Sequence, residues 1–181
     1  MRSRKLRRRT KETCIEVSLE IDGAGRYDVA LPRQFSRHMV ETLARYAGWN
    51  LKIRAVGDNP HHVEEDVAIV LGKAFRDALG DAPVERIAHA VVPMDDALVL
   101  TAVDIVDRPF CHAPLPDPDY VHFLRSFAMD ARINLHVDIL RGTDEHHIVE
   151  AAFKSLGMAL RQAARRTGDV KSTKSRVEWS E

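Results

Sequence analysis

Two adjacent histidines followed by a glutamate occur twice in this chain, and the sequence around them is repeated as well. The two copies are His61-His62-Val63-Glu64-Glu65 and His146-His147-Ile148-Val149-Glu150. Each copy follows a short apolar run typical of a strand, at residues 51–56 and 133–140. Each also opens a helix-like run, at residues 63–79 and 148–164. One copy could arise by chance, but two in matching contexts predict an internal duplication with two matched sites.

The spacing within the motif suits metal binding. Residues three and four apart share a face of a helix, so Glu65 lies on one face with His61 and His62. Adjacent histidines point about 100° apart, which assigns the two members of a pair to different ions. Imidazole and carboxylate together suit Mn, Fe, Co, Ni and Zn. The alternative is a polar helix start without a metal, and the repetition of the whole pattern argues against it.

Composition limits the classes of protein to which the chain can belong. It has 181 residues with 27 basic and 27 acidic side chains, so no general attraction to nucleic acid is expected. Its length fits one domain or two small fused halves, and 45% apolar content is enough for a sizeable core. Its 2 cysteines give no disulfide framework, so we expect a reducing, cytoplasmic setting. We expect no membrane partner, because no apolar run approaches about 20 residues, and no signal peptide, because no apolar stretch follows the basic start.

The remaining segments predict strands and helices in alternation. Residues 11–21 alternate polar and apolar side chains as in a half-buried strand, and residues 26–31 are expected to be its hairpin partner. Helical spacing extends over residues 32–49 and 120–129. Two further strands are expected within residues 86–105.

These elements predict an α+β fold made of two duplicated halves. Residues 1–88 form the first half-repeat and residues 89–181 the second, each in the order strand-strand-helix-strand-helix. The helices are expected to pack between the two sheets. Residues 1–9 carry six basic side chains, which would suit a nucleic-acid arm or a phosphate-binding edge. A solvated, partly frayed terminus is the prediction we prefer.

Several shorter motifs add a family resemblance. They are Thr10-Lys11-Glu12-Thr13, Phe35-x-x-His38-Met39, Val92-Pro93-Met94-Asp95, Arg108-Pro109, Leu135-His136 and Ser172-Thr173-Lys174. Together with the two His-His motifs, they make the chain resemble the imidazoleglycerol-phosphate dehydratase family over almost its whole length. The resemblance implies two ferredoxin-like halves and a homo-oligomer of 24 subunits built from trimers. It also implies two Mn²⁺ ions per active site, held between subunits.

The resemblance further implies roles for individual residues. The implied metal ligands are His38, His61, His62, Glu65, His136, His146, His147 and Glu150. The implied phosphate-binding residues are Arg86, Arg108, Ser172 and Lys174. The implied catalytic residues are Glu12, as the acid/base carboxylate, together with Glu65, Glu150 and Lys154.

The implied function is the metal-dependent dehydration of D-erythro-imidazole-glycerol phosphate to imidazole acetol-phosphate, in histidine biosynthesis. The chain also departs from the family pattern. Its loop before His61 is shorter and lacks the usual aspartates, and the segment after Arg108 is shorter as well. These departures motivate an alternative, a diverged paralogue that binds metal and an imidazole or phosphate ligand without this activity. A structural shell protein, in which metal only joins subunits, is a third hypothesis.

Overall fold

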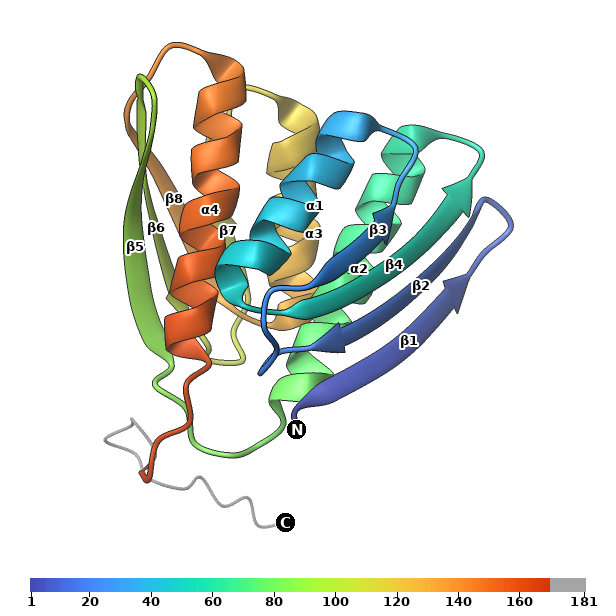
Figure 1. Ribbon diagram of the computed structural model, residues 1–181, viewed down its shortest axis with the longest axis horizontal. Helices are drawn as coiled ribbons and strands as arrows, with labels where there is room; N and C mark the ends of the chain where they lie inside the picture. The colour runs from blue at the N-terminus through green and yellow to red at the C-terminus, as the bar shows by residue number, and fades with distance from the viewer. Residues whose placement is uncertain (170–181) are drawn as a thin grey trace.

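The segments with alternating side chains form two sheets, and the segments with helical spacing form helices between them. The computed structural model describes residues 1–169, which form two four-stranded sheets and four helices. The sheets lie on the outside, and the helices fill the space between them (Figure 1). This arrangement confirms the predicted α+β fold of two similar halves. No helix among the described residues is long and apolar enough to cross a membrane.

The two halves have the same topology. The first consists of β1 (Ser3–Arg9), β2 (Thr13–Glu20), β3 (Tyr27–Ala30), α1 (Gln34–Ala47), β4 (Asn50–Gly57) and α2 (Pro60–Leu79). The second consists of β5 (Ile87–Met94), β6 (Ala97–Asp104), β7 (Phe110–His112), α3 (Pro118–Ala131), β8 (Asn134–Arg141) and α4 (Glu145–Ala163). The strand orders are β1-β2-β4-β3 and β5-β6-β8-β7, and in each sheet only the last pair is parallel.

The predicted hairpin of residues 26–31 with the strand before it is wrong. The segment forms β3, which pairs in parallel with β4, because β1 and β4 already occupy both edges of β2. The side chain of Asn50 helps to hold the turn beside β4, since its Oδ1 accepts hydrogen bonds from the backbone N–H groups of Ala24 and Arg26 at 3.0 and 3.3 Å. The predicted order of elements also lacked one strand in each half, β1 in the first and β7 in the second.

The basic N-terminal segment is also not frayed. It forms the edge strand β1, and acidic side chains of the first half pair with its arginines. Arg2 lies against Asp22, with Nη2 2.5 Å from Oδ1, and Arg8 pairs with Asp66 on α2. The charges that suggested a nucleic-acid arm therefore serve in part to fasten this strand.

Glycines let the helices approach closely at equivalent places in the two halves. A Cβ on Gly72 of α2 would lie 2.5 Å from the carbonyl oxygen of Phe127 on α3. A Cβ on Gly157 of α4 would lie 2.9 Å from the carbonyl oxygen of Leu43 on α1. Distances this short leave no room for a methyl group, so each crossing requires glycine. The helices therefore pack as two pairs, α2 with α3 and α1 with α4.

All four helices begin at the same end of the molecule, the upper edge in Figure 1. Helix N-termini carry unpaired N–H groups and the positive ends of the helix dipoles. Both His-His motifs lie at this end, in the first turns of α2 and α4. The fold thus brings the two copies of the motif to one face of the chain.

Candidate metal and active site

Each His-His pair is held by the residue that caps its helix. The side chain of Asn59 accepts a hydrogen bond from the N–H of His61 at 2.9 Å. Asp144 does the same for His146 and His147, at 2.8 and 3.2 Å. A capped first turn is well ordered, which is a requirement for a precise metal site. Both helices begin slightly earlier than their apolar periodicity indicated, so the histidines are helical.

In the first half, His61 and Glu65 meet a third residue, His122 of α3. One ligand atom from each of the three residues lies within 4.8 Å of the others. The rings of His61 and His122 are stacked, with centroids 5.3 Å apart. His122 Nε2 lies 3.2 Å from Glu65 Oε1, although the two atoms are not aligned for a hydrogen bond. The donor types and the spacing suit a divalent transition metal.

The second histidine of this pair lies beside two carboxylates. Glu12, Asp58 and His62 form another group whose ligand atoms lie within 4.8 Å of one another. Asp58 Oδ1 is 3.1 Å from His62 Nδ1, and Glu12 Oε2 is 4.0 Å from the same nitrogen. The hydrogen bond with Asp58 raises the pKa of His62. The predicted acid/base carboxylate therefore lies next to a predicted ligand.

In the second half, the corresponding glutamate is surrounded by cations and imidazoles. Glu150 Oε2 lies 3.2 Å from His146 Nε2 and 3.4 Å from His38 Nε2, and Lys154 Nζ lies 2.9 Å from Oε1. Burial raises the pKa of Glu150, but the hydrogen bond and the charge of Lys154 oppose it, and the net shift is downward. Three of the predicted residues thus surround the carboxylate of a fourth, Glu150.

His147 is held apart from this group by the β5–β6 turn. Its Nδ1 lies 2.7 Å from Asp96 Oδ1, and its Nε2 lies 3.3 Å from Asp95 Oδ2. Backbone N–H groups of Thr143 and Asp144 and the His147 ring all bond to Asp96. They hold the pKa of that carboxyl well below its usual range. Asp96 is therefore an ionised acceptor on one side of the imidazole.

The sequence did not identify His122, Asp119, Asp96 or Asp58 as neighbours of the histidines. His122 is the fifth residue of α3, and His38 is the fifth residue of α1. A comparison of the two first helices would have found this match. Asp119 lies 3.1 Å from His61 Nδ1, and its pKa is lowered by its hydrogen bonds with Arg33. No local pattern marks Asp119 or Asp96, because each reaches its histidine across more than 50 residues of chain.

The structure does not bring every predicted residue to this end. Arg86 lies beside the last turn of α4, where its N–H donates to the carbonyl of Ala163 at 2.9 Å and its guanidinium pairs with Asp104. A helix of 19 residues is about 28 Å long, so Arg86 is far from the His-His pairs of the same chain. Arg108 lies near the start of β8, where its carbonyl accepts from Asn134.

His136 lies on the outer face of the second sheet, with its ring 5.1 Å from that of Phe110. Ser172 and Lys174 lie outside the described residues. Within one chain, the predicted site is therefore divided between two regions. One holds the His-His pairs, and the other holds His136 and the arginines.

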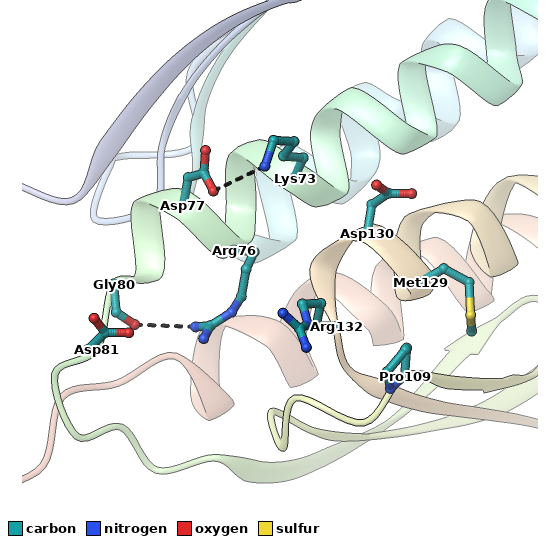
Figure 2. A pocket seen from close by; sticks show the side chains of 9 residues that line it. All are labelled: Lys73, Arg76, Asp77, Gly80, Asp81, Pro109, Met129, Asp130 and Arg132. Carbon is teal, nitrogen blue, oxygen red and sulfur yellow. Dashed lines mark hydrogen bonds and ion pairs between the residues drawn. The ribbon is translucent and has the colours of Figure 1, made fainter. Parts of the chain in front are cut away.

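A separate pocket lies at the opposite end of α2 and α3, with a volume of about 580 Å³ (Figure 2). Its charged lining consists of Lys73, Arg76, Arg132, Asp77, Asp81 and Asp130. Lys73 pairs with Asp77 at 3.7 Å, and Arg76 donates to the carbonyl of Gly80 at 3.4 Å. Cations and acids are equal in number here and no histidine lines the pocket, so its lining differs from that of the candidate metal site.

Comparison with known proteins agrees with this geometry. A model of imidazoleglycerol-phosphate dehydratase matches residues 32–160. The chain belongs to the imidazoleglycerol-phosphate dehydratase family. The chain is 45% identical to the enzyme of Desulforudis audaxviator, with 91% of each chain covered. It is 39% identical to that of Dictyoglomus thermophilum, over 98% of this chain and 100% of the relative.

Solved structures of the family have the same fold. The enzyme from Pyrococcus furiosus, in complex with (S)-C348, superposes with a TM-score of 0.82 at 37% identity, over 95% of this chain and all of that one. The enzyme from Staphylococcus aureus gives a TM-score of 0.81 at 29% identity, over 90% and 98%. The predicted family and the predicted duplicated α+β fold are confirmed, and the chain is an enzyme of this family.

Proposed function

We propose that the chain catalyses the Mn²⁺-dependent dehydration of D-erythro-imidazole-glycerol phosphate to imidazole acetol-phosphate, in histidine biosynthesis. The observation that carries the proposal is the pairing of the two His-His-x-x-Glu motifs at one end of the fold. Membership of the dehydratase family supports the reaction class.

The donor set fits a pair of Mn²⁺ ions. Neutral imidazole and carboxylate are the ligands that such ions accept. In His61 and His62, Nδ1 already faces a carboxylate oxygen, so Nε2 is the nitrogen available to a metal. The eight proposed ligands are His38, His61, His62, Glu65, His136, His146, His147 and Glu150. When bound, the ions supply Lewis-acid polarisation of the substrate's imidazole ring.

The chain's own residues handle the protons and the charge. Glu12 is exposed and lies beside His62, so substrate can reach it, and we assign to it the removal of the proton from the carbon next to the departing hydroxyl. Lys154 keeps Glu150 ionised, which suits a ligand that must not carry a proton. Arg86 and Arg108, with Ser172 and Lys174, anchor the phosphate and fix its distance from the ring.

A complete site requires a second copy of the chain. The His-His pairs and the phosphate-binding arginines lie too far apart within one chain to contact one small substrate. The second sheet offers a surface for assembly, because its outer face exposes large apolar side chains: Ile87, Val91, Phe110 and Leu140. His136 lies on the same face. We therefore propose a homo-oligomer, a 24-mer built from trimers, in which this face carries His136 and the arginines to a neighbouring His-His end.

The role of Glu12 gives a direct test of the reaction. Glu12→Gln removes the acid/base carboxylate and is expected to lower kcat by about 100- to 10,000-fold. Glu16→Gln is the matched control, because Glu16 is an exposed glutamate of neighbouring β2. Full activity in both variants would remove Glu12 from the mechanism. Tight Mn²⁺ binding without product in the unaltered protein would favour the diverged paralogue.

A further inference from the structure

One histidine of each His-His pair rests on a carboxylate that is itself fixed by other groups. These carboxylates belong to Asp119 and Asp96, which come from different parts of the chain. In both cases one oxygen is bonded to fixed donors, and the other oxygen faces the Nδ1 atom of the histidine. The same arrangement, formed twice by unrelated segments, is more informative than either contact alone.

Asp119 is the more firmly held of the two. Arg33 donates from Nη1 and Nη2 to Asp119 Oδ2, both at 2.7 Å. Arg33 is in turn placed by the buried Glu64, whose Oε1 lies 3.2 Å from its Nε. The N–H of Asp119 donates to Asp117 Oδ1 at 2.9 Å, so backbone and side chain are both fixed. Oδ1 of Asp119 is thereby left to face His61 Nδ1 at 3.1 Å.

Asp96 repeats this division of its two oxygens. Its Oδ2 accepts from the N–H and the hydroxyl of Thr143, at 2.7 and 3.0 Å, and from the N–H of Asp144 at 3.2 Å. Its Oδ1 lies 2.7 Å from His147 Nδ1. The position of His147 is therefore set by a loop in the same way that Arg33 sets that of His61.

A fixed, ionised carboxylate decides which ring nitrogen carries the proton. It can only accept hydrogen bonds, so the nitrogen that faces it must be protonated. The other nitrogen then keeps its lone pair. A carboxylate behind a histidine also fixes the orientation of the ring and makes it a stronger metal ligand.

We propose that Asp119 is a positioning residue that keeps the proton of His61 on Nδ1 and presents Nε2 as a metal ligand. Arg33 holds Asp119 in place for this task. Asp96 orients the ring of His147 in the same way, but there Nε2 also faces a carboxylate, that of Asp95, at 3.3 Å. This inference rests on the proposed function, because it assigns His61 to a Mn²⁺ ion. The test therefore measures metal affinity rather than turnover.

The experiment is a calorimetric Mn²⁺ titration of the chelator-stripped, full-length protein and its variants. Asp119→Asn is expected to weaken one class of sites by about 10- to 100-fold and to leave the other class unchanged. Asp119→Glu restores a carboxylate and is expected to recover part of this loss. Asp117→Asn is the matched control, because it removes the same charge two residues away while asparagine still caps α3. Its affinity is expected to stay within about twofold of the unaltered protein.

A change in the metal's surroundings supplies a second readout. The absorption spectrum of the Co²⁺-loaded protein is expected to change in Asp119→Asn and not in Asp117→Asn. If Asp119→Asn does not fold, Arg33→Lys serves instead, because it keeps the carboxylate but loses the double hydrogen bond. A weaker class of sites is expected there as well.

Unchanged Mn²⁺ affinity in the Asp119 variants would overturn the inference, and so would equal weakening in Asp119→Asn and Asp117→Asn. A protein that binds no Mn²⁺ at all would overturn this inference and the proposed function together. The inference stands, and only the proposed reaction fails, if Asp119→Asn selectively weakens binding to a protein that forms no product.

Discussion

The two halves share one topology, yet they support the glutamates of their His-His-x-x-Glu motifs, which we propose as metal ligands, in different ways. In the second half, Lys154 lies one turn after Glu150 and neutralises it at 2.9 Å. In the first half, Ile69 occupies the corresponding position, and His122 from the neighbouring helix contacts Glu65. The motif positions are thus equivalent in the two halves, while the side chains around them differ. The histidines and the glutamate, which the proposed chemistry needs, occur in both halves. The side chain that contacts the glutamate differs, being a histidine in the first half and a lysine in the second.

The largest expected effect comes from removing one member of each His-His pair. His62→Ala and His147→Ala are each expected to lower kcat/KM by on the order of 1,000-fold, since a bound metal contributes several kcal/mol to the transition state. Lys73→Ala, in the pocket at the other end of the molecule, is the control and should keep its activity. Steady-state kinetics with added Mn²⁺ measures all three. A large loss in only one half would mean that the two sites are not equivalent in function.

The two close helix contacts, α2 with α3 and α1 with α4, are expected to be destabilised equally when their glycine is replaced by alanine. Gly72→Ala and Gly157→Ala each force a methyl group against a backbone carbonyl and are expected to cost about 1–3 kcal/mol in free energy of unfolding. Gly168→Ala is the control, because no atom lies within 4 Å of a Cβ at that position. Chemical denaturation measures each value. If one crossing tolerates alanine, the helix pairs are not packed equally closely.

The ion pair of Lys154 with Glu150 is expected to contribute more to stability than an exposed ion pair of the same spacing. Lys154→Met leaves a nearly buried carboxylate without its cation and is expected to cost on the order of 2 kcal/mol. The pair of Lys73 with Asp77 has the same spacing but is more exposed, so Lys73→Met should cost about 0.5 kcal/mol or less. Denaturation of the metal-free variants measures both. Equal costs would contradict the role given to burial.

The smallest expected effect concerns the edge of the first sheet. Hydrogen bonding to Arg2 lowers the pKa of Asp22. Its stabilising contribution is therefore fully present above the ordinary aspartate pKa, near 3.9, and is lost as the pH falls through the lowered value. Asp22→Asn is expected to lower the unfolding free energy by about 0.5 kcal/mol at pH 6. Thermal unfolding of both proteins should show that this difference in stability becomes smaller as the pH falls. A difference that grows in acid would contradict the stabilising role of ionised Asp22.

Local patterns in the sequence predicted more of the fold than of the site. The repeated His-His-x-x-Glu motif and its flanking periodicity predicted the two halves, the helices and the helix starts that hold the histidines. They did not predict the pairing of β3 with β4, because strand pairing depends on which edges other strands have already taken. They also missed His122 and Asp119, which contact the first pair from α3, a neighbouring helix that is distant in the sequence. Chain topology places such partners, and short-range spacing does not record them.

The most direct test of the account is dehydratase activity on imidazole-glycerol phosphate, before and after chelation and again after Mn²⁺ is restored. Product formation is expected to disappear in chelator and to return with Mn²⁺, because the proposed site is built from two His-His-x-x-Glu motifs. Activity that is indifferent to chelation, in a protein shown to be free of metal, would contradict it.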